Sequence, residues 1–189
     1  DIDARLSELL PLVFDTKAAL DAAPREFDAA AHHALARRAA EESLVLLKNE
    51  GALLPLAAGT KVAVIGDFAK NPRYQGAGSS MVNSTQVDVL LDKLIDSAVN
   101  VIGYQQGFDR HGKPDAALQK SACELAAQAN TVVLCMGLDE IAESEGLDRS
   151  NLRLAQNQVE LLQAVKAVNP KIVVVLYSGS VVETPWLHN

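Results

Sequence analysis

Five carboxylate side chains and one arginine are gathered in a short stretch of the chain, residues 137–149. The acidic residues are Asp139, Glu140, Glu143, Glu145 and Asp148. Carboxyl groups transfer protons when they are held in a defined geometry, whereas a loop without a task only has to be polar. A solvated acidic loop is the plain alternative, so the place of this stretch in the fold has to decide between the two.

The acidic stretch directly follows an apolar run that has the length and composition of a buried strand. Four such runs alternate with helical patterns, at residues 61–66, 99–104, 131–136 and 171–177. This order predicts an α/β fold of the flavodoxin-like, doubly wound type. We expect a mainly parallel sheet with helices on both faces, a three-layer α/β/α sandwich.

Three predicted loops leave the carboxyl ends of these strands, at residues 67–84, 137–151 and 178–184. Open α/β sheets bind their ligands at that edge. We therefore expect the three loops to converge on one site that includes the acidic stretch.

The N-terminal part has a different pattern from the rest of the chain. Residues 1–30 are predicted to form a helical tail followed by a linker at 21–27, and Pro11 is expected to kink or end the first helix. The sandwich domain is expected to span residues 31–189. Within it, residues 157–160 have the form of a capping box that predicts a helix start.

Composition excludes several classes of partner. The chain has 189 residues, 49% of them apolar, and a formal charge of −7. The negative charge argues against nucleic acid and anionic membranes as partners.

Cys123 and Cys135 have no metal-ligand spacing, so we expect reduced structural cysteines and no metal. With no run of membrane-span length and no signal peptide at the start, we expect a cytoplasmic protein.

Five blocks of the sequence lie at residues 37–56, 62–66, 76–80, 143–149 and 173–186. In this order, they resemble the second, C-terminal domain of glycoside hydrolase family 3 enzymes. The Glu-Ser-Glu-Gly-Leu-Asp-Arg run at 143–149 resembles the segment that carries the catalytic acid/base. The resemblance implies that residues 31–189 are an α/β sandwich domain of this type.

The family resemblance also implies an activity, that of a retaining β-glycosidase, most often a β-glucosidase, without a cofactor. It places the acid/base at Glu145, the glutamate before Gly146, with Glu143 as the second choice. The substrate that the resemblance implies is a β-linked glucoside or oligosaccharide. The resemblance also implies an aspartate nucleophile on a separate N-terminal β/α barrel domain of the same protein. Retaining hydrolysis needs two carboxyl groups about 5–5.5 Å apart, and two domains can supply one each across a cleft.

Other residues of the loops are candidates for substrate binding. Asp148 and Arg149 could bind sugar hydroxyls, or pair with each other to hold the loop, and a structural role is favoured for Arg149. Ser79 and Ser80 could line the cleft, or simply tighten a loop that is rich in glycine. If Glu143 is not the acid, it is expected to be an exposed charge or a contact to a sugar hydroxyl.

Two other classes of function stay open. A nucleotide-binding module is suggested by Gly76 and Gly78 after a strand, but the third glycine of the dinucleotide fingerprint is missing. A non-catalytic carbohydrate-binding or docking domain is the second alternative. Sugar binding usually involves exposed aromatic side chains, and only 4% of the residues are aromatic.

Overall fold

The computed structural model describes residues 1–23 and 26–188 and divides into two compact units, Asp1–Val45 and Leu46–Asn189. The predicted boundary at residue 30 falls within the first of these units, which also contains helix α2 (Ala29–Glu42). None of the residues of α2 is buried. Pro24 and Arg25, in the predicted linker, lie outside the described residues.

The first unit consists of α1 (Ile2–Asp21) and α2. Each helix starts at an aspartate that accepts a backbone N–H, Asp1 from Asp3 and Asp28 from Ala31, as N-capping requires. Helix α1 continues through Pro11, so Pro11 does not end the helix, which was one of its two expected effects. A proline removes one N–H donor from the helix, and the helical spacing of apolar residues continues on both sides of it.

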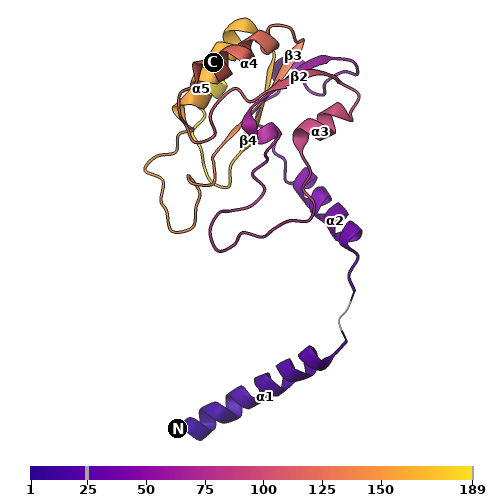
Figure 1. Ribbon diagram of the computed structural model, residues 1–189, viewed down its shortest axis with the longest axis vertical. Helices are drawn as coiled ribbons and strands as arrows, with labels where there is room; N and C mark the ends of the chain where they lie inside the picture. The colour runs from indigo at the N-terminus through magenta and orange to yellow at the C-terminus, as the bar shows by residue number, and fades with distance from the viewer. Residues whose placement is uncertain (24–25, 189) are drawn as a thin grey trace. The chain divides into compact units, whose positions relative to one another are not determined.

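The second unit is built on one sheet (Figure 1). Its strands are parallel and lie in the order β2-β1-β3-β4. The strands are β1 (Lys61–Ile65), β2 (Asn100–Gln105), β3 (Thr131–Gly137) and β4 (Ile172–Tyr177). All four predicted strands are confirmed, as is the parallel sheet. The central strands are the most buried, since every residue of β3 and all of β1 after Lys61 are shielded from solvent.

Three helices connect the strands: α3 (Leu90–Ile95), α4 (Ala116–Ala126) and α5 (Gln156–Val168). Right-handed crossovers put α3 on one face and α4 and α5 together on the other, and α4 and α5 pack against each other. Short 3-10 helices lie at Glu50–Ala52, Asp67–Ala69 and Pro185–His188. The predicted three-layer sandwich is therefore confirmed.

The order of the strands creates a switch point between β1 and β3. The chain leaves β1 toward β2, and it leaves β3 in the opposite direction toward β4. Open α/β sheets bind their ligands at such a point. The loops that follow the two strands here are residues 67–84 and the acidic stretch.

The start of α5 differs from the prediction, because the helix begins at Gln156 and its N-cap residue, Ala155, has no side-chain oxygen to accept a backbone N–H. The side chain of Asn157 instead donates to the carbonyls of Asp109 and Lys113, at 2.8 and 3.2 Å. The expected capping box is wrong, since its first residue holds a neighbouring loop rather than its own helix.

A buried glutamine joins α5 to the root of the acidic stretch. Gln158 is 1% exposed. Its Oε1 accepts the N–H of Gly137, and its Nε2 donates to the carbonyl of Gly137, both at 2.9 Å. A buried amide that satisfies both backbone groups of one residue fixes that residue in place, so the acidic stretch leaves the sheet from a fixed point.

Both cysteines are free thiols, as expected. Cys135 is buried in β3, and its burial raises the thiol pKa to about 12, so it is an unreactive core residue. Among residues 1–23 and 26–188, no group of three or more His, Cys, Asp or Glu side chains is arranged to hold a metal ion. Over the same residues, no helix combines the length and apolar character that crossing a membrane requires.

Candidate active site

The three loops that follow β1, β3 and β4 meet at one edge of the sheet. The backbone of Ala77 pairs with that of Ser144, and the N–H of Glu145 donates to the Ala77 carbonyl at 3.2 Å. The third loop joins through Gly179, whose N–H donates to Glu143 Oε2 at 3.0 Å. The predicted convergence of loops 67–84, 137–151 and 178–184 is confirmed.

Glu145 lies at the surface of this junction, with its carboxylate held by one serine. The Ser79 N–H donates to Glu145 Oε2 at 2.8 Å, and the Ser79 hydroxyl donates to the same oxygen. These bonds stabilise the ionised form and lower the pKa of Glu145 below that of an ordinary glutamate. In this chain, Glu145 is therefore an exposed, oriented carboxylate.

Glu143 has a different environment, although it lies only two residues away. Its side chain and that of Arg73 are each 9% exposed, and the two form an ion pair. Ser180 donates its hydroxyl to the other oxygen of Glu143. The expectation of an exposed charge at Glu143 is wrong, because three donors from two other loops enclose the carboxylate.

Asp148 and Arg149 do not pair with each other. Arg149 Nη2 donates to the hydroxyl of Ser180 at 3.1 Å and to the carbonyl of Val181 at 2.6 Å. Arg149 thus ties the acidic stretch to loop 178–184, as a structural role requires. Asp148 is exposed, and so is Ser80, next to the serine that holds Glu145. Substrate binding by Asp148, Arg149, Ser79 and Ser80 stays a prediction.

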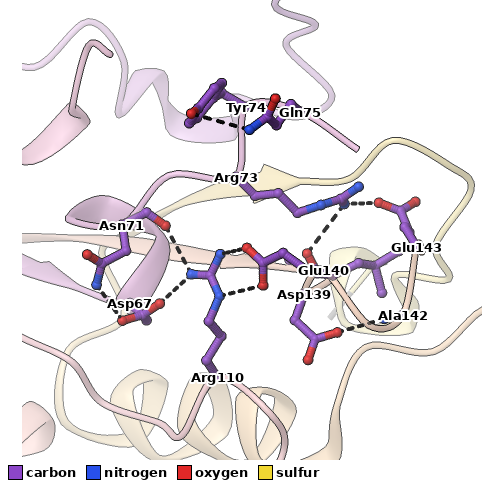
Figure 2. Close-up of polar contacts among 12 residues, drawn as sticks. Asp67, Asn71, Arg73, Tyr74, Gln75, Arg110, Asp139, Glu140, Ala142 and Glu143 are labelled. Atoms are coloured by element: carbon purple, nitrogen blue, oxygen red, sulfur yellow. Dashed lines mark hydrogen bonds and ion pairs between the residues drawn. The ribbon is translucent and has the colours of Figure 1, made fainter. Parts of the chain in front are cut away.

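An arginine that the sequence analysis missed lies at the base of the junction. Arg110, in the loop after β2, binds both oxygens of Glu140 and also reaches Asp67 Oδ2 and the Asn71 carbonyl (Figure 2). Its guanidinium carbon lies 4.5 Å from the ring centre of Phe68. Burial disfavours the charge of Arg110, but its bonds to Glu140 and Asp67 outweigh this and raise its pKa. In return, Arg110 lowers the pKa of Glu140.

A signal for Arg110 was present in the sequence. Loops after strands share one edge of a parallel sheet, and Arg110 lies in the polar segment after the second predicted strand. Applying the same rule to that loop would have placed an arginine beside five acids. The rule would not have said which acid it binds.

A pocket of about 560 Å³ lies beside the junction. It is lined by the acidic stretch and the start of α5, including Asp139, Asp148, Arg149 and Gln158, but not by Glu145. Asp139 is occupied there, because it accepts the N–H of Ala142 at 2.8 Å and contacts His111 Nδ1 at 3.0 Å. The pocket and the oriented carboxylate are thus two separate features of the site.

The second unit is thus an α/β sandwich with an exposed, oriented carboxylate, Glu145, at its switch point. Residues 44–189 match the model of the glycosyl hydrolase family 3 C-terminal domain, and the chain belongs to this family.

Several known proteins are similar to the chain. It is 41% identical over 199 residues to an exo-alpha-(1->6)-L-arabinopyranosidase of Bifidobacterium breve, and the match covers 100% of the chain and 26% of that protein. It is 42% identical over 166 residues to thermostable beta-glucosidase B of Acetivibrio thermocellus, covering 86% and 22%. The crystal structure of the Bifidobacterium adolescentis GH3 beta-glucosidase superposes with a TM-score of 0.86 at 46% identity, covering 94% and 26%. The chain thus spans about a quarter of the length of these relatives.

The contact between Ser79 and Glu145 leads to a first prediction. Replacing Ser79 by alanine removes the hydroxyl that stabilises the charged carboxylate, so the pKa of Glu145 should rise toward that of an ordinary glutamate. The measurement is a carbon-13 NMR titration of the glutamate side-chain carboxyls in the purified chain. Ser80→Ala is the control and should leave the titration of Glu145 unchanged. An unchanged midpoint in Ser79→Ala would show that the bond does not form in solution.

Proposed function

We propose that this chain is a domain of a retaining β-glycosidase, with a β-glucosidase as the first candidate, and that Glu145 is its acid/base. The reaction is hydrolysis of terminal, non-reducing β-D-glycosides. One observation carries the proposal. Of the glutamates in the acidic stretch, Glu140 and Glu143 are bound to arginines, whereas Glu145 is exposed, is oriented by Ser79 and is open to a ligand.

Retaining hydrolysis assigns two tasks to two carboxyl groups. The nucleophile attacks the anomeric carbon while the acid protonates the departing oxygen, and the same residue then removes a proton from the water that releases the sugar. We assign the second task to Glu145. The nucleophile, an aspartate, belongs to the proposed N-terminal barrel domain, because the resemblance implies no nucleophile within this chain.

The low pKa of the exposed Glu145 fits a domain that is one half of a site. A general acid has to be protonated near the working pH, and an exposed carboxylate bound by Ser79 favours the charged form. Covering Glu145 with a second domain and a sugar removes water from it, and desolvation raises a carboxyl pKa. Glu145 is thus expected to act as a proton donor only in the assembled protein, where its pKa is raised.

The names of the relatives support the class of reaction more than the choice of sugar. One relative is an arabinopyranosidase and another a beta-glucosidase. The chain is 41% identical to the first and 42% identical to the second. We therefore propose that the barrel domain contributes most of the sugar selectivity.

The test compares the purified chain with the full-length protein on aryl β-glucosides. We expect no turnover by the chain alone, because an acid without a nucleophile forms no glycosyl-enzyme, and turnover by the full-length protein. Activity of the chain alone that is lost in Glu145→Gln would place the second carboxylate within this domain, with Asp139 and Asp148 as the first to replace. An inactive full-length protein that still binds sugars would favour a docking domain instead.

A further inference from the structure

Two arginines hold the turn that leads to Glu145, one at each end. Arg110 binds Glu140 near the start of the turn, and Arg73 binds Glu143 near its end (Figure 2). Each arginine comes from the loop of a different strand. The ends of the turn are therefore attached to parts of the chain that are far away in sequence.

The pair of Arg73 and Glu143 is the more buried of the two, and stability is a weak explanation for it. Removing two charges from water costs about as much as their attraction returns, so a buried ion pair is often no better than apolar side chains of the same size. Arg73 even leaves its Nε buried without a hydrogen-bond partner in the described residues, which is unfavourable. A pair with little value for stability can still determine geometry.

The geometry that it determines includes Glu145. The carboxylate of Glu143 binds Arg73 from loop 67–84 as well as Gly179 and Ser180 from loop 178–184. Between the two glutamates, the backbone is held against Ala77 at Ser144 and Glu145. Only Ser144 separates the two glutamates, so fixing Glu143 inside the junction restricts where the backbone of Glu145 can lie, and from there its carboxylate binds Ser79.

We infer that Arg73 is a positioning residue for Glu145, acting through Glu143 at the junction of the three loops. This inference rests on the proposed acid/base role of Glu145. Arg73 touches neither the substrate nor the transferred proton in this scheme. Its task is to keep the acid within reach of the departing oxygen, where a displacement of about 1 Å can cost about a hundredfold in rate.

The experiment uses the full-length protein with Arg73→Met, Arg73→Lys and the control Arg153→Met. Arg153 also pairs with a glutamate, Glu183, but the two side chains are 77% and 46% exposed, so its loss should matter little. For Arg73→Met we expect kcat on poor leaving groups to fall about tenfold to a hundredfold, with KM changed by less than about twofold. Azide should not restore the rate, because the carboxylate of Glu145 is still present.

The pH profile separates positioning from general support of the fold. Without Arg73, the charge of Glu143 is unpaired two residues from Glu145, and the bond to Ser79 is loosened. Both changes favour protonated Glu145, so the alkaline limb of kcat/KM should move to higher pH. Arg73→Lys keeps the charge but not the planar donor geometry, and it should lie between the wild type and Arg73→Met on both measures.

Each outcome has a defined meaning. If Arg73→Met matches Arg153→Met in kcat and in the alkaline limb, the inference is wrong. A lower melting temperature of Arg73→Met with an unchanged kcat per folded molecule also overturns the inference. If Arg73→Met does not fold, the kcat and the alkaline limb of Arg73→Lys decide in its place. The proposed function has a separate test. It is wrong if Glu145→Gln retains full activity on substrates with poor leaving groups.

Discussion

Glu145→Gln in the full-length protein is expected to lower turnover about a hundredfold to ten-thousandfold on glycosides with poor leaving groups, the usual contribution of a general acid or base. Activated phenols leave without a proton, so formation of the glycosyl-enzyme from them should suffer much less. Release of the sugar should also slow, because the same residue activates the water. The measurement is a series of aryl glycosides of increasing leaving-group pKa, followed by steady-state and burst kinetics.

Azide gives the second half of this test, since it is a nucleophile that needs no base. Added azide should restore turnover of activated substrates by Glu145→Gln and yield a β-glycosyl azide. Glu143→Gln is the matched control. It keeps the carboxylate at position 145, so it should show no azide rescue and a much weaker dependence on the leaving group. If the two variants behave the other way round, the acid is Glu143, and if neither shows the effect, this stretch is not the acid/base carrier.

Gly78→Ala is expected to lower kcat/KM about a hundredfold, although it adds only a methyl group. A Cβ at Gly78 would lie 2.6 Å from Glu145 Cβ and 2.9 Å from Glu145 Oε2, which is too close for any real contact. Glu145 or loop 67–84 must therefore move, and a shift of about 1 Å at a reacting group has this order of effect. The measurements are kcat/KM on an aryl β-glucoside and the melting temperature of the same samples.

Gly146→Ala is the control for backbone strain. Gly78 and Gly146 both have a positive φ, 104° and 78°, but a Cβ at Gly146 would meet nothing within 4 Å. Both variants pay roughly 1–3 kcal/mol for an unfavourable backbone conformation. Only Gly78→Ala displaces the carboxylate. Equal losses of activity in the two variants would mean that strain, and not the collision with Glu145, explains the result.

The sequence alone predicted the sheet and the edge at which the loops meet. The runs in β1 and β3 are short, apolar and followed by glycine, and their alternation with helices allows few topologies. A parallel sheet then forces the loops after its strands to one edge. These are properties of periodicity and connection order, which a single sequence contains.

The sequence did not predict which acids are buried. Arg73 lies 70 residues from Glu143 in the chain, and Arg110 lies 30 residues from Glu140. Such partners are chosen by the three-dimensional arrangement of loop tips, for which no local pattern exists. For this reason the enclosed position of Glu143 was not predicted, and an exposed charge was one of the roles expected for it.

The error at the start of α5 has a similar cause. Asn157 was assigned a capping role from its neighbours in sequence, but its amide binds Asp109 and Lys113 on another loop. A rule based on neighbouring residues does not include partners that lie more than 40 residues away in the chain.

The shared carboxylate of Glu143 has a consequence for protein engineering. Because one side chain is bound by donors from loops 67–84 and 178–184, none of the three loops is an independent module. A chimera that imports the acidic stretch alone, with its Glu143, into a scaffold without these donors brings a buried charge with nothing to bind. The three loops are better transplanted together, as a single cassette.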